Sequence, residues 1–350
     1  MRRRSFLKQA AFLAAAPALI SRASAGTPAT GKIIRTIGPS GQHPDINHWV
    51  SWVVDNAVSG GDLTAPVEAQ IQRGGVSASA SQIISGWAGK TFPTTLVPVP
   101  GAGFKDNRNF LTTPFTFETE NGAFIDADLN LGITLDVTVD RFTLAGLQIR
   151  NRSGGGYTVR LRGERSAVTF CIADGAGMGH NAPTIRFDQA CLYPSLTNSL
   201  VLGRNKIDAM TVQCGAVSGE FICDRNTLIS TVPNPGIGEG AGYGEAIMVG
   251  FIPAKITNTV AIGFMAFDFW PDSSKADPAS GHNATSLKAF TCKGFASDSQ
   301  VGVATAQEFM APVEDWRLKT TSRQLKGKGI SGGDIGAWQT SAVPSPGLGP

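Results

Sequence analysis

Short apolar runs that end at a glycine or a polar turn recur along the middle of the chain. Five of them start at residues 146, 170, 198, 225 and 258, so successive starts are 24, 28, 27 and 33 residues apart. They are Gly146–Asn151, Phe170–Gly175, Asn198–Gly203, Arg225–Ser230 and Asn258–Gly263. A recurrence of this length, across loops of unequal length, predicts a solenoid of stacked strand-and-turn repeats.

A second series of strand-like runs lies between the members of the first. It comprises Tyr157–Gly163, Pro183–Gln189 and Met210–Gly215, with starts 26 and 27 residues apart, and Glu245–Gly250 resembles a fourth member. Two series that recur in step predict one coil per repeat, and hence an all-β, single-stranded right-handed parallel β-helix. A sandwich or closed barrel is the alternative, but it predicts short hairpin turns and no register across long loops.

Alternation within the second series assigns its two faces, because successive side chains on a strand point to opposite sides. We expect Val159, Ile185 and Val212 to form one buried column. Leu161, Phe187 and Cys214, two residues further along each strand, form the next inward-facing column. The side chains expected to point outward are those of Arg160, Arg186 and Gln213, together with Arg162 and Asp188.

One column of the first series mixes apolar and small polar residues. It contains Leu147, Cys171, Ser199, Asn226 and Thr259. Small polar residues stacked coil upon coil predict a hydrogen-bonded ladder inside the solenoid. Two of the five cysteines, Cys171 and Cys214, fall in inward columns, where a free cysteine behaves as a small hydrophobic residue.

The N-terminal segment has the pattern of an export signal. Residues 1–25 combine a basic start, an apolar stretch from Ala10 to Ile20 and the closing residues Ala23-Ser24-Ala25. The run Arg3–Lys8 resembles the twin-arginine motif. The apolar stretch is too short for the roughly 20 residues of a membrane span, so we expect cleavage without stable membrane insertion. The expected location is periplasmic or extracellular.

Removal of this segment changes the charge of the chain. Without its five basic residues, 25 basic and 27 acidic residues remain, and they form no clustered basic face. This composition argues against a nucleic-acid partner.

The remaining chain divides into four expected segments. These are an N-terminal cap with the first coils (26–120), coils with long edge loops (121–310), a closing segment (311–340) and a disordered Pro/Gly/Ser-rich tail (341–350). Apolar residues at 46, 49, 50 and 53 behind Asp45 predict a short amphipathic helix that covers the first coil. Val67–Gln72 and Thr94–Val99 have the composition of early strands.

Motifs at both ends resemble those of secreted and phage-borne proteins of the pectate-lyase-like superfamily. The opening motif is Ile34–Gly41 before a Trp-containing helix. The closing motif comprises Asp315–Leu318, Ser322 and Gly332–Ala337. The resemblance implies the β-helix fold for most of residues 33–338. It leaves the function open, because the superfamily includes lyases, hydrolases, esterases, epimerases, adhesins and tailspikes.

Loops between the two series predict a binding edge, because the loops of a solenoid collect along one side. They are Asn151–Gly156, Asp174–Ala182, Gly203–Ala209, Ser230–Gly244 and Asp268–Ser286. The last two carry candidate substrate-binding residues: Glu239, Tyr243, Glu245, Trp270, Asp272 and His282. Tyr243 or Trp270 would stack on a sugar and the carboxylates would accept hydrogen bonds from it. The alternative is that these are ordinary solvated turns.

The outward arginines are the second candidate site. Lyases of the superfamily use an Arg or Lys base, often beside calcium, so the resemblance implies calcium as the candidate cofactor. The candidate catalytic residues are Arg160, Arg186, Asp188, Lys206 and Asp208. Asp174 and Asp188 are the carboxylates that a hydrolase would need. The alternative is that Arg160 and Arg186 pair with Asp188 on a solvated face. The four histidines (43, 48, 180 and 282) lack metal-ligand spacing.

Two functions follow from these patterns. The first is an exported protein that binds a polysaccharide or cell-surface glycan. In the enzymatic form of this hypothesis, the protein also cleaves that ligand as a lyase or hydrolase. The second is a non-catalytic structural or adhesive module, such as a surface adhesin or phage tail component.

Overall fold

The computed structural model describes residues 31–104, 114–129, 132–152, 156–175, 183–203, 210–230, 245–263, 267–270, 275–312 and 314–337. Apart from Gly31, these belong to one unit, Lys32–Pro350. The expected signal peptide (1–25) and tail (341–350) lie outside the described residues. Within the described part, no helix has the length and apolar content needed to cross a membrane.

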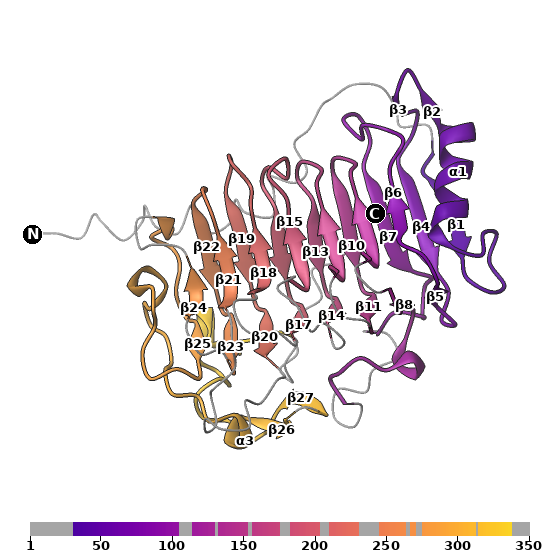
Figure 1. The fold of residues 1–350 in the computed structure, drawn as a ribbon. Coiled ribbons are helices and arrows are strands. Elements are labelled where there is room, and N and C mark those ends of the chain that lie inside the picture. Colours follow the sequence, from indigo (N-terminus) through magenta and orange to yellow (C-terminus); the bar gives the residue numbers. More distant parts are fainter. Residues whose placement is uncertain are drawn as a thin grey trace, which may run out of the picture. The chain divides into compact units, whose positions relative to one another are not determined.

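The described chain winds through three parallel sheets in turn (Figure 1). Sheet 1 contains β1 (Ile33–Ile37), β4 (Val67–Ile71), β7 (Thr94–Pro98), β10 (Phe142–Ala145), β13 (Ala167–Thr169), β16 (Ser195–Thr197), β19 (Phe221–Asp224) and β22 (Ala254–Thr257). Sheet 2 contains β5 (Val76–Ala78), β8 (Phe124–Ala127), β11 (Gln148–Asn151), β14 (Ile172–Asp174), β17 (Leu200–Gly203), β20 (Thr227–Ser230), β23 (Val260–Ile262) and β25 (Ala284–Thr285). Sheet 3 contains β6 (Gln82–Ile84), β9 (Leu135–Val137), β12 (Val159–Leu161), β15 (Ile185–Phe187), β18 (Met210–Cys214), β21 (Glu245–Val249) and β24 (Phe267–Trp270).

From β4 to β24, each coil contributes one strand to each sheet, and every strand pairs with its counterparts on the neighbouring coils. The parallel β-helix predicted from the repeats is therefore confirmed. The first and second sequence series are sheets 2 and 3, respectively.

The short helix α1 (Ile46–Ala57) closes the first coils, as predicted. The Asp45 carboxylate accepts a hydrogen bond from the His48 backbone N–H at 2.9 Å, which satisfies one free donor of the first turn. Ile46, Trp49 and Val53 recur at helical spacing and are buried against the core. Beyond α1, β2 (Val58–Ser59) and β3 (Asp62–Leu63) form a small antiparallel pair.

The register of sheet 3 matches the predicted faces. Ile185 pairs with Val159 on one side and Val212 on the other, and all three are fully buried. Arg186 occupies the alternate position and is partly exposed. A one-residue slip would bury the arginines and expose the aliphatic column, so this register is strongly specified.

The predicted polar ladder runs inside the coil beside sheet 2. The Ser199 backbone N–H donates to Asn226 Oδ1 at 2.9 Å, and the Thr259 N–H donates to Asn283 Oδ1 at 3.0 Å. Further steps join Cys171 N to Ser199 Oγ, Asn226 N to Thr259 Oγ1 and Asn283 N to Ser299 Oγ. Each step satisfies a backbone donor that would otherwise be buried without a partner.

The residue before each ladder member adopts a left-handed backbone conformation. The φ angles lie between 49° and 55° at Phe170, Asn198, Arg225, Asn258, His282 and Asp298. Asparagine and aspartate tolerate this conformation best among residues with a side chain. The recurrence marks a common turn between sheets 1 and 2.

Cysteines reinforce the apolar interior. All five are buried, and burial raises the pKa of the Cys171 thiol to about 12. Cys171 and Cys214 point inward as predicted and belong to the main core.

A second apolar core covers the outer face of sheet 2. Side chains from β14, β17, β20 and β23 pack there against two segments distant in sequence. The C-terminal segment supplies Phe309 on β26 (Phe309–Ala311) and Trp316 on β27 (Asp315–Leu318). Figure 1 shows α3 (Thr305–Glu308), β26 and β27 beneath β17, β20 and β23.

The other cover segment comes from the early coils and contains Phe104, Phe115 and Phe117. The Phe115 N–H donates to Asp315 Oδ1 at 2.9 Å, so the two cover segments are tied together. Three short 3-10 helices, Thr119–Asn121, Lys293–Phe295 and Ile330–Gly332, complete the described elements. With sheet 2 covered along these strands, the outer faces of sheets 1 and 3 remain for binding.

Candidate functional site

The outer face of sheet 3 carries a row of polar residues over four consecutive coils. Asp136 pairs with Arg160, Arg160 with Arg186, and Arg186 with Gln213. Neighbouring strands lie about 4.8 Å apart, so like charges in such a row require counter-charges.

Asp188 supplies the counter-charge for both arginines of the row. Its Oδ2 accepts from Arg160 Nε at 2.7 Å, and its Oδ1 accepts from Arg186 Nε at 2.5 Å. One carboxylate therefore bridges two coils. The predicted alternative, in which Arg160 and Arg186 pair with Asp188, is the arrangement that the structure contains.

A parallel arrangement on the preceding coils was not predicted. Arg162 forms a two-point ion pair with Asp136, whose carboxylate is almost fully buried. The sequence signal was the alternation Leu135-Asp136-Val137, which matches the later members of the second series in pattern but not in charge.

Tyr157 completes the cluster from the turn that precedes β12. Its hydroxyl accepts a hydrogen bond from an Arg186 terminal nitrogen at 2.7 Å. The guanidinium carbons of Arg186 and Arg160 lie 5.3 and 5.6 Å from its ring centroid, within cation–π range. Tyr157 opens the second repeat series, but its role in the cluster depends on contacts between coils and was not predicted.

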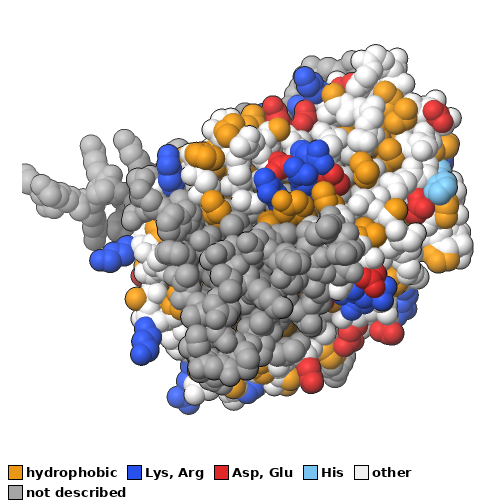
Figure 2. All heavy atoms as spheres, viewed as in Figure 1, with side chains coloured by type: hydrophobic (Ala, Val, Ile, Leu, Met, Phe, Trp, Pro, Cys, Tyr) orange, Lys and Arg blue, Asp and Glu red, His pale blue; other side chains and the backbone are white. Residues whose placement is uncertain are grey.

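The arginines of this cluster are more accessible than their carboxylates. The side chains of Arg160, Arg186 and Arg162 are 26, 29 and 37% exposed, whereas those of Asp188 and Asp136 are 12 and 9% exposed. The guanidinium groups of the three arginines therefore reach solvent, whereas the carboxylates that they bind lie closer to the sheet. Figure 2 shows basic and acidic side chains gathered together on the viewed face.

The charge state of Arg186 restricts its chemistry. Burial lowers its pKa, but the hydrogen bond and Coulombic attraction to Asp188 outweigh burial, so the pKa is raised overall. Arg186 therefore remains a cation at any physiological pH. Such a group binds anions well and is a poor proton acceptor.

Several predicted site residues lie outside the described residues: Lys206, Asp208, Glu239, Tyr243 and Asp272. The backbones of Glu245 and Trp270 are described, in β21 and β24 of sheet 3. Trp270 pairs in register with Met248, and Met248 with Gln213, so its position continues the Arg160–Arg186 row.

The segment Asp268–Ser286 differs from the expected single loop. Its first residues are the end of strand β24, which pairs with β21. Ala276 and Gly281 then bridge to Ala254 and Thr257 of β22, so the chain follows sheet 1 before it reaches sheet 2. The expectation was wrong because β24 is a complete sheet 3 strand preceded by a connection of only a few residues.

His282 lies at a turn that belongs to the scaffold. It has a φ of 53°, and its Nδ1 lies 3.3 Å from the Lys328 carbonyl oxygen. The structure places it at the turn into sheet 2, whereas Trp270 ends a strand of sheet 3.

The described residues give no support to a calcium site. They contain no group of three or more His, Cys, Asp or Glu residues arranged to hold a metal ion. Asp136 and Asp188 are engaged by arginines.

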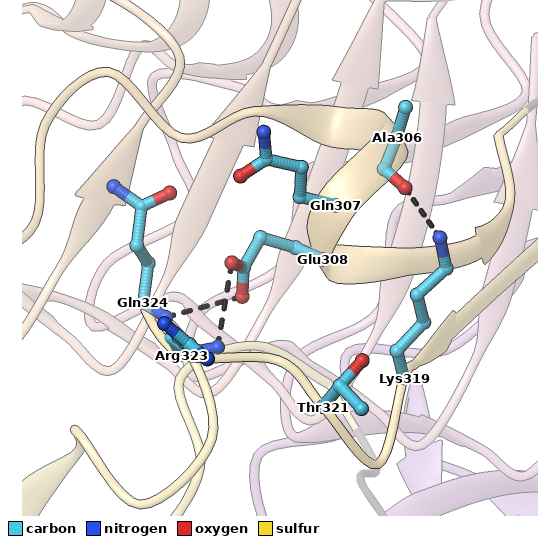
Figure 3. A pocket seen from close by; sticks show the side chains of 7 residues that line it. All are labelled: Ala306, Gln307, Glu308, Lys319, Thr321, Arg323 and Gln324. Carbon is cyan, nitrogen blue, oxygen red and sulfur yellow. Dashed lines mark hydrogen bonds between the residues drawn. The ribbon is translucent and has the colours of Figure 1, made fainter.

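A shallow hollow lies in the C-terminal segment between α3 and the chain that follows β27 (Figure 3). Glu308 points toward this chain, where its carboxylate accepts from the backbone N–H groups of Arg323 and Gln324 at 3.4 and 3.2 Å. The Ser322 hydroxyl donates to the same carboxylate. The buried acid therefore holds the segment together, and we assign it a structural role.

A further carboxyl group, Glu220, lies at the turn between β18 and β19. Burial raises its pKa, the nearby Asp277 charge and hydrogen bond raise it further, and Lys255 partly opposes them. The folded state therefore binds this proton more tightly than the unfolded chain. The resulting stabilisation is present below the ordinary pKa of 4.5 and is lost as the pH rises through the raised value.

We expect Glu220→Gln to raise the melting temperature at pH 7, because the glutamine removes the repulsion from Asp277. The gain should disappear at pH 3.5, where the native glutamate is protonated. Differential scanning calorimetry at both pH values measures the change, with the exposed Glu164→Gln as the control. An equal gain at both pH values would contradict the assignment.

No protein-family model matches the chain, and no curated protein matches it in sequence. Among solved structures, carrot pectin methylesterase is similar with 10% identity and a TM-score of 0.43, over 80% of this chain and 91% of that one.

Two further solved structures show the same degree of similarity. A pectin methylesterase from Aspergillus niger has 11% identity and a TM-score of 0.38, over 75% of this chain and 86% of that one. Escherichia coli YbhC has 12% identity and a TM-score of 0.38, over 91% of this chain and 86% of that one. Similarities this distant carry no argument about activity.

Proposed function

We propose that this protein is an exported β-helix that binds an acidic polysaccharide on the outer face of sheet 3. The carboxylates of the sugar chain would approach the accessible edges of Arg160, Arg186 and Arg162. Arginine matches carboxylate geometry with two parallel donors, and the strand spacing of the β-helix repeats those donors along its axis.

The observation that carries this proposal is the layering of charge on that face. Asp188 and Asp136 lie beneath the guanidinium groups that they bind, so the surface offered to a ligand is cationic although its residues are paired. An arginine that is already oriented by a buried carboxylate loses little conformational freedom when it binds a ligand.

The same layering favours binding over the lyase-type chemistry considered above. A lyase base must lose its proton, and the attraction of Asp188 opposes that loss at Arg186. Binding without cleavage is also what an adhesive module would need, so that function remains the second candidate.

Arg186→Gln should lower affinity for polygalacturonate or alginate on the order of tenfold, through the loss of one charge-assisted contact. Asp188 keeps Arg160 as a partner in this variant, so the fold should survive. Isothermal titration calorimetry measures the affinity, and the distant, exposed Arg73→Gln is the matched control.

Affinity should also fall with added salt, and neutral glucan should not bind. Absence of binding to every acidic glycan tested would overturn the proposal. Chromatography of the incubated glycans separates the two candidates, since shortened or unsaturated products mean an enzyme and intact chains mean an adhesive module.

A further inference from the structure

The three most exposed large hydrophobic side chains of the described residues occupy equivalent turns. Tyr193, Val217 and Phe251 are 55, 56 and 63% exposed. They lie in the turns that lead from sheet 3 to sheet 1 on three consecutive coils, after β15, β18 and β21. We call these three residues the corner ridge.

Such a ridge is unusual on a water-exposed turn. Single exposed hydrophobic residues are common, but one on the same turn of three consecutive coils indicates a surface that meets a partner. Turns more often carry glycine, proline, asparagine, aspartate or serine than a large apolar side chain.

Tyr193 is fixed in place despite its exposure. A Cβ on Gly219, which has a φ of 94°, would approach within 3.1 Å of the Tyr193 ring carbon Cδ1. The glycine therefore lets the next coil pass directly against the ring. From the preceding coil, the guanidinium carbon of Arg165 lies 5.8 Å from the ring centroid. An aromatic ring held in this way offers a preformed contact surface.

Two observations indicate which ligand would bind the corner ridge. The turn that carries Tyr193 begins at Asp188, which binds Arg160 and Arg186 of the proposed glycan face. Arg165 is exposed beside Tyr193, so a cation and an aromatic ring lie together. A uronic acid matches this pair, because its ring has an apolar face of C–H groups and carries one carboxylate.

The spacing along the ridge also fits an extended polymer. Tyr193 and Phe251 lie two coils apart, about 9.6 Å along the stacking direction. Val217, on the coil between them, contributes apolar contact without an aromatic ring.

We propose that the corner ridge is a second binding track for an acidic polysaccharide. Sugar rings stack on Tyr193 and Phe251, and Arg165 receives a carboxylate. This inference rests on the proposed function for its ligand, but it concerns different residues on a different surface of the coil.

The test compares variants by calorimetry, with hexasaccharides of polygalacturonate and of alginate, and with the same sugars as uncharged methyl esters. The double variant Tyr193→Ala/Phe251→Ala should weaken charged and esterified hexasaccharides alike, on the order of tenfold. Arg165→Gln should weaken the charged forms alone. Ile34→Ala, which removes an exposed apolar side chain at the N-terminal cap, is the matched control and should change nothing.

The outcomes separate the two proposals. If the double variant keeps its affinity while Arg186→Gln loses affinity, the proposal for the corner ridge is overturned and the proposal for sheet 3 stands. The reverse result supports the ridge and overturns the sheet 3 site, and no binding by the native protein overturns both. A native dimer that the double variant converts to monomer, measured by light scattering, would mean that a second copy covers the ridge and would also overturn the inference.

Discussion

Ile185→Asp is expected to abolish folding, whereas Arg186→Ala, one position away, should shift the melting temperature by a few degrees. Ile185 is fully buried between Val159 and Val212, which are fully buried themselves. An unpaired buried carboxylate costs on the order of 4 kcal/mol or more, which is a large share of the stability of a typical domain.

Arg186 provides the matched control because it is the next residue on the same strand. Its removal leaves Asp188 bound to Arg160, so the loss should be about 1 kcal/mol. Circular dichroism during heating and the soluble yield of each variant measure the difference. Greater damage from Arg186→Ala would contradict the register of sheet 3.

Asn226→Ala should have the second-largest effect, about 2–4 kcal/mol. The Asn226 side chain accepts from Ser199 N at 2.9 Å and donates to the Leu196 carbonyl at 2.8 Å. Alanine leaves both backbone groups buried without these partners and adds a cavity, so desolvation and packing losses combine.

Asn56→Ala on α1 is the control for this substitution, because Asn56 is exposed and donates to a carbonyl that water can also satisfy. Urea unfolding followed by tryptophan fluorescence gives both free energies of unfolding. Equal losses at the two sites would show that the ladder does not stabilise the coil.

The sequence was sufficient for the coil because its strongest signals are periodic. Stacking places equivalent residues one above another, so the register of Val159, Ile185 and Val212 follows from spacing alone. The same logic predicted the ladder through Ser199 and Asn226.

Most strands of sheet 1 were not predicted from the sequence, because each of them is short. Central strands such as β13 and β16 are three residues long, and each buries one residue, Val168 or Leu196, between partly exposed neighbours. So short an alternation gives little periodic signal.

The candidate site was predicted only in part. Arg160, Arg186 and Asp188 were selected because alternation assigns them to one face. The contributions of Tyr157 and Asp136 depend on contacts between coils, which no spacing within one repeat records. The exposure of Tyr193 and its contact with Gly219 depend likewise on how one turn lies against the next.

The cover over sheet 2 has a consequence for how the chain reaches its folded state. It joins Phe115 to Asp315, two positions 200 residues apart, and its C-terminal half is synthesised after the coils that it covers. Contacts between such distant residues form slowly, because a long loop must close before any stabilisation is gained. Until then, the outward side chains of β14, β17 and β20, Ile172, Leu200 and Ile229 among them, remain in water as a continuous apolar strip. The nascent chain therefore passes through an aggregation-prone stage that ends when the segment with Phe309 and Trp316 docks on sheet 2.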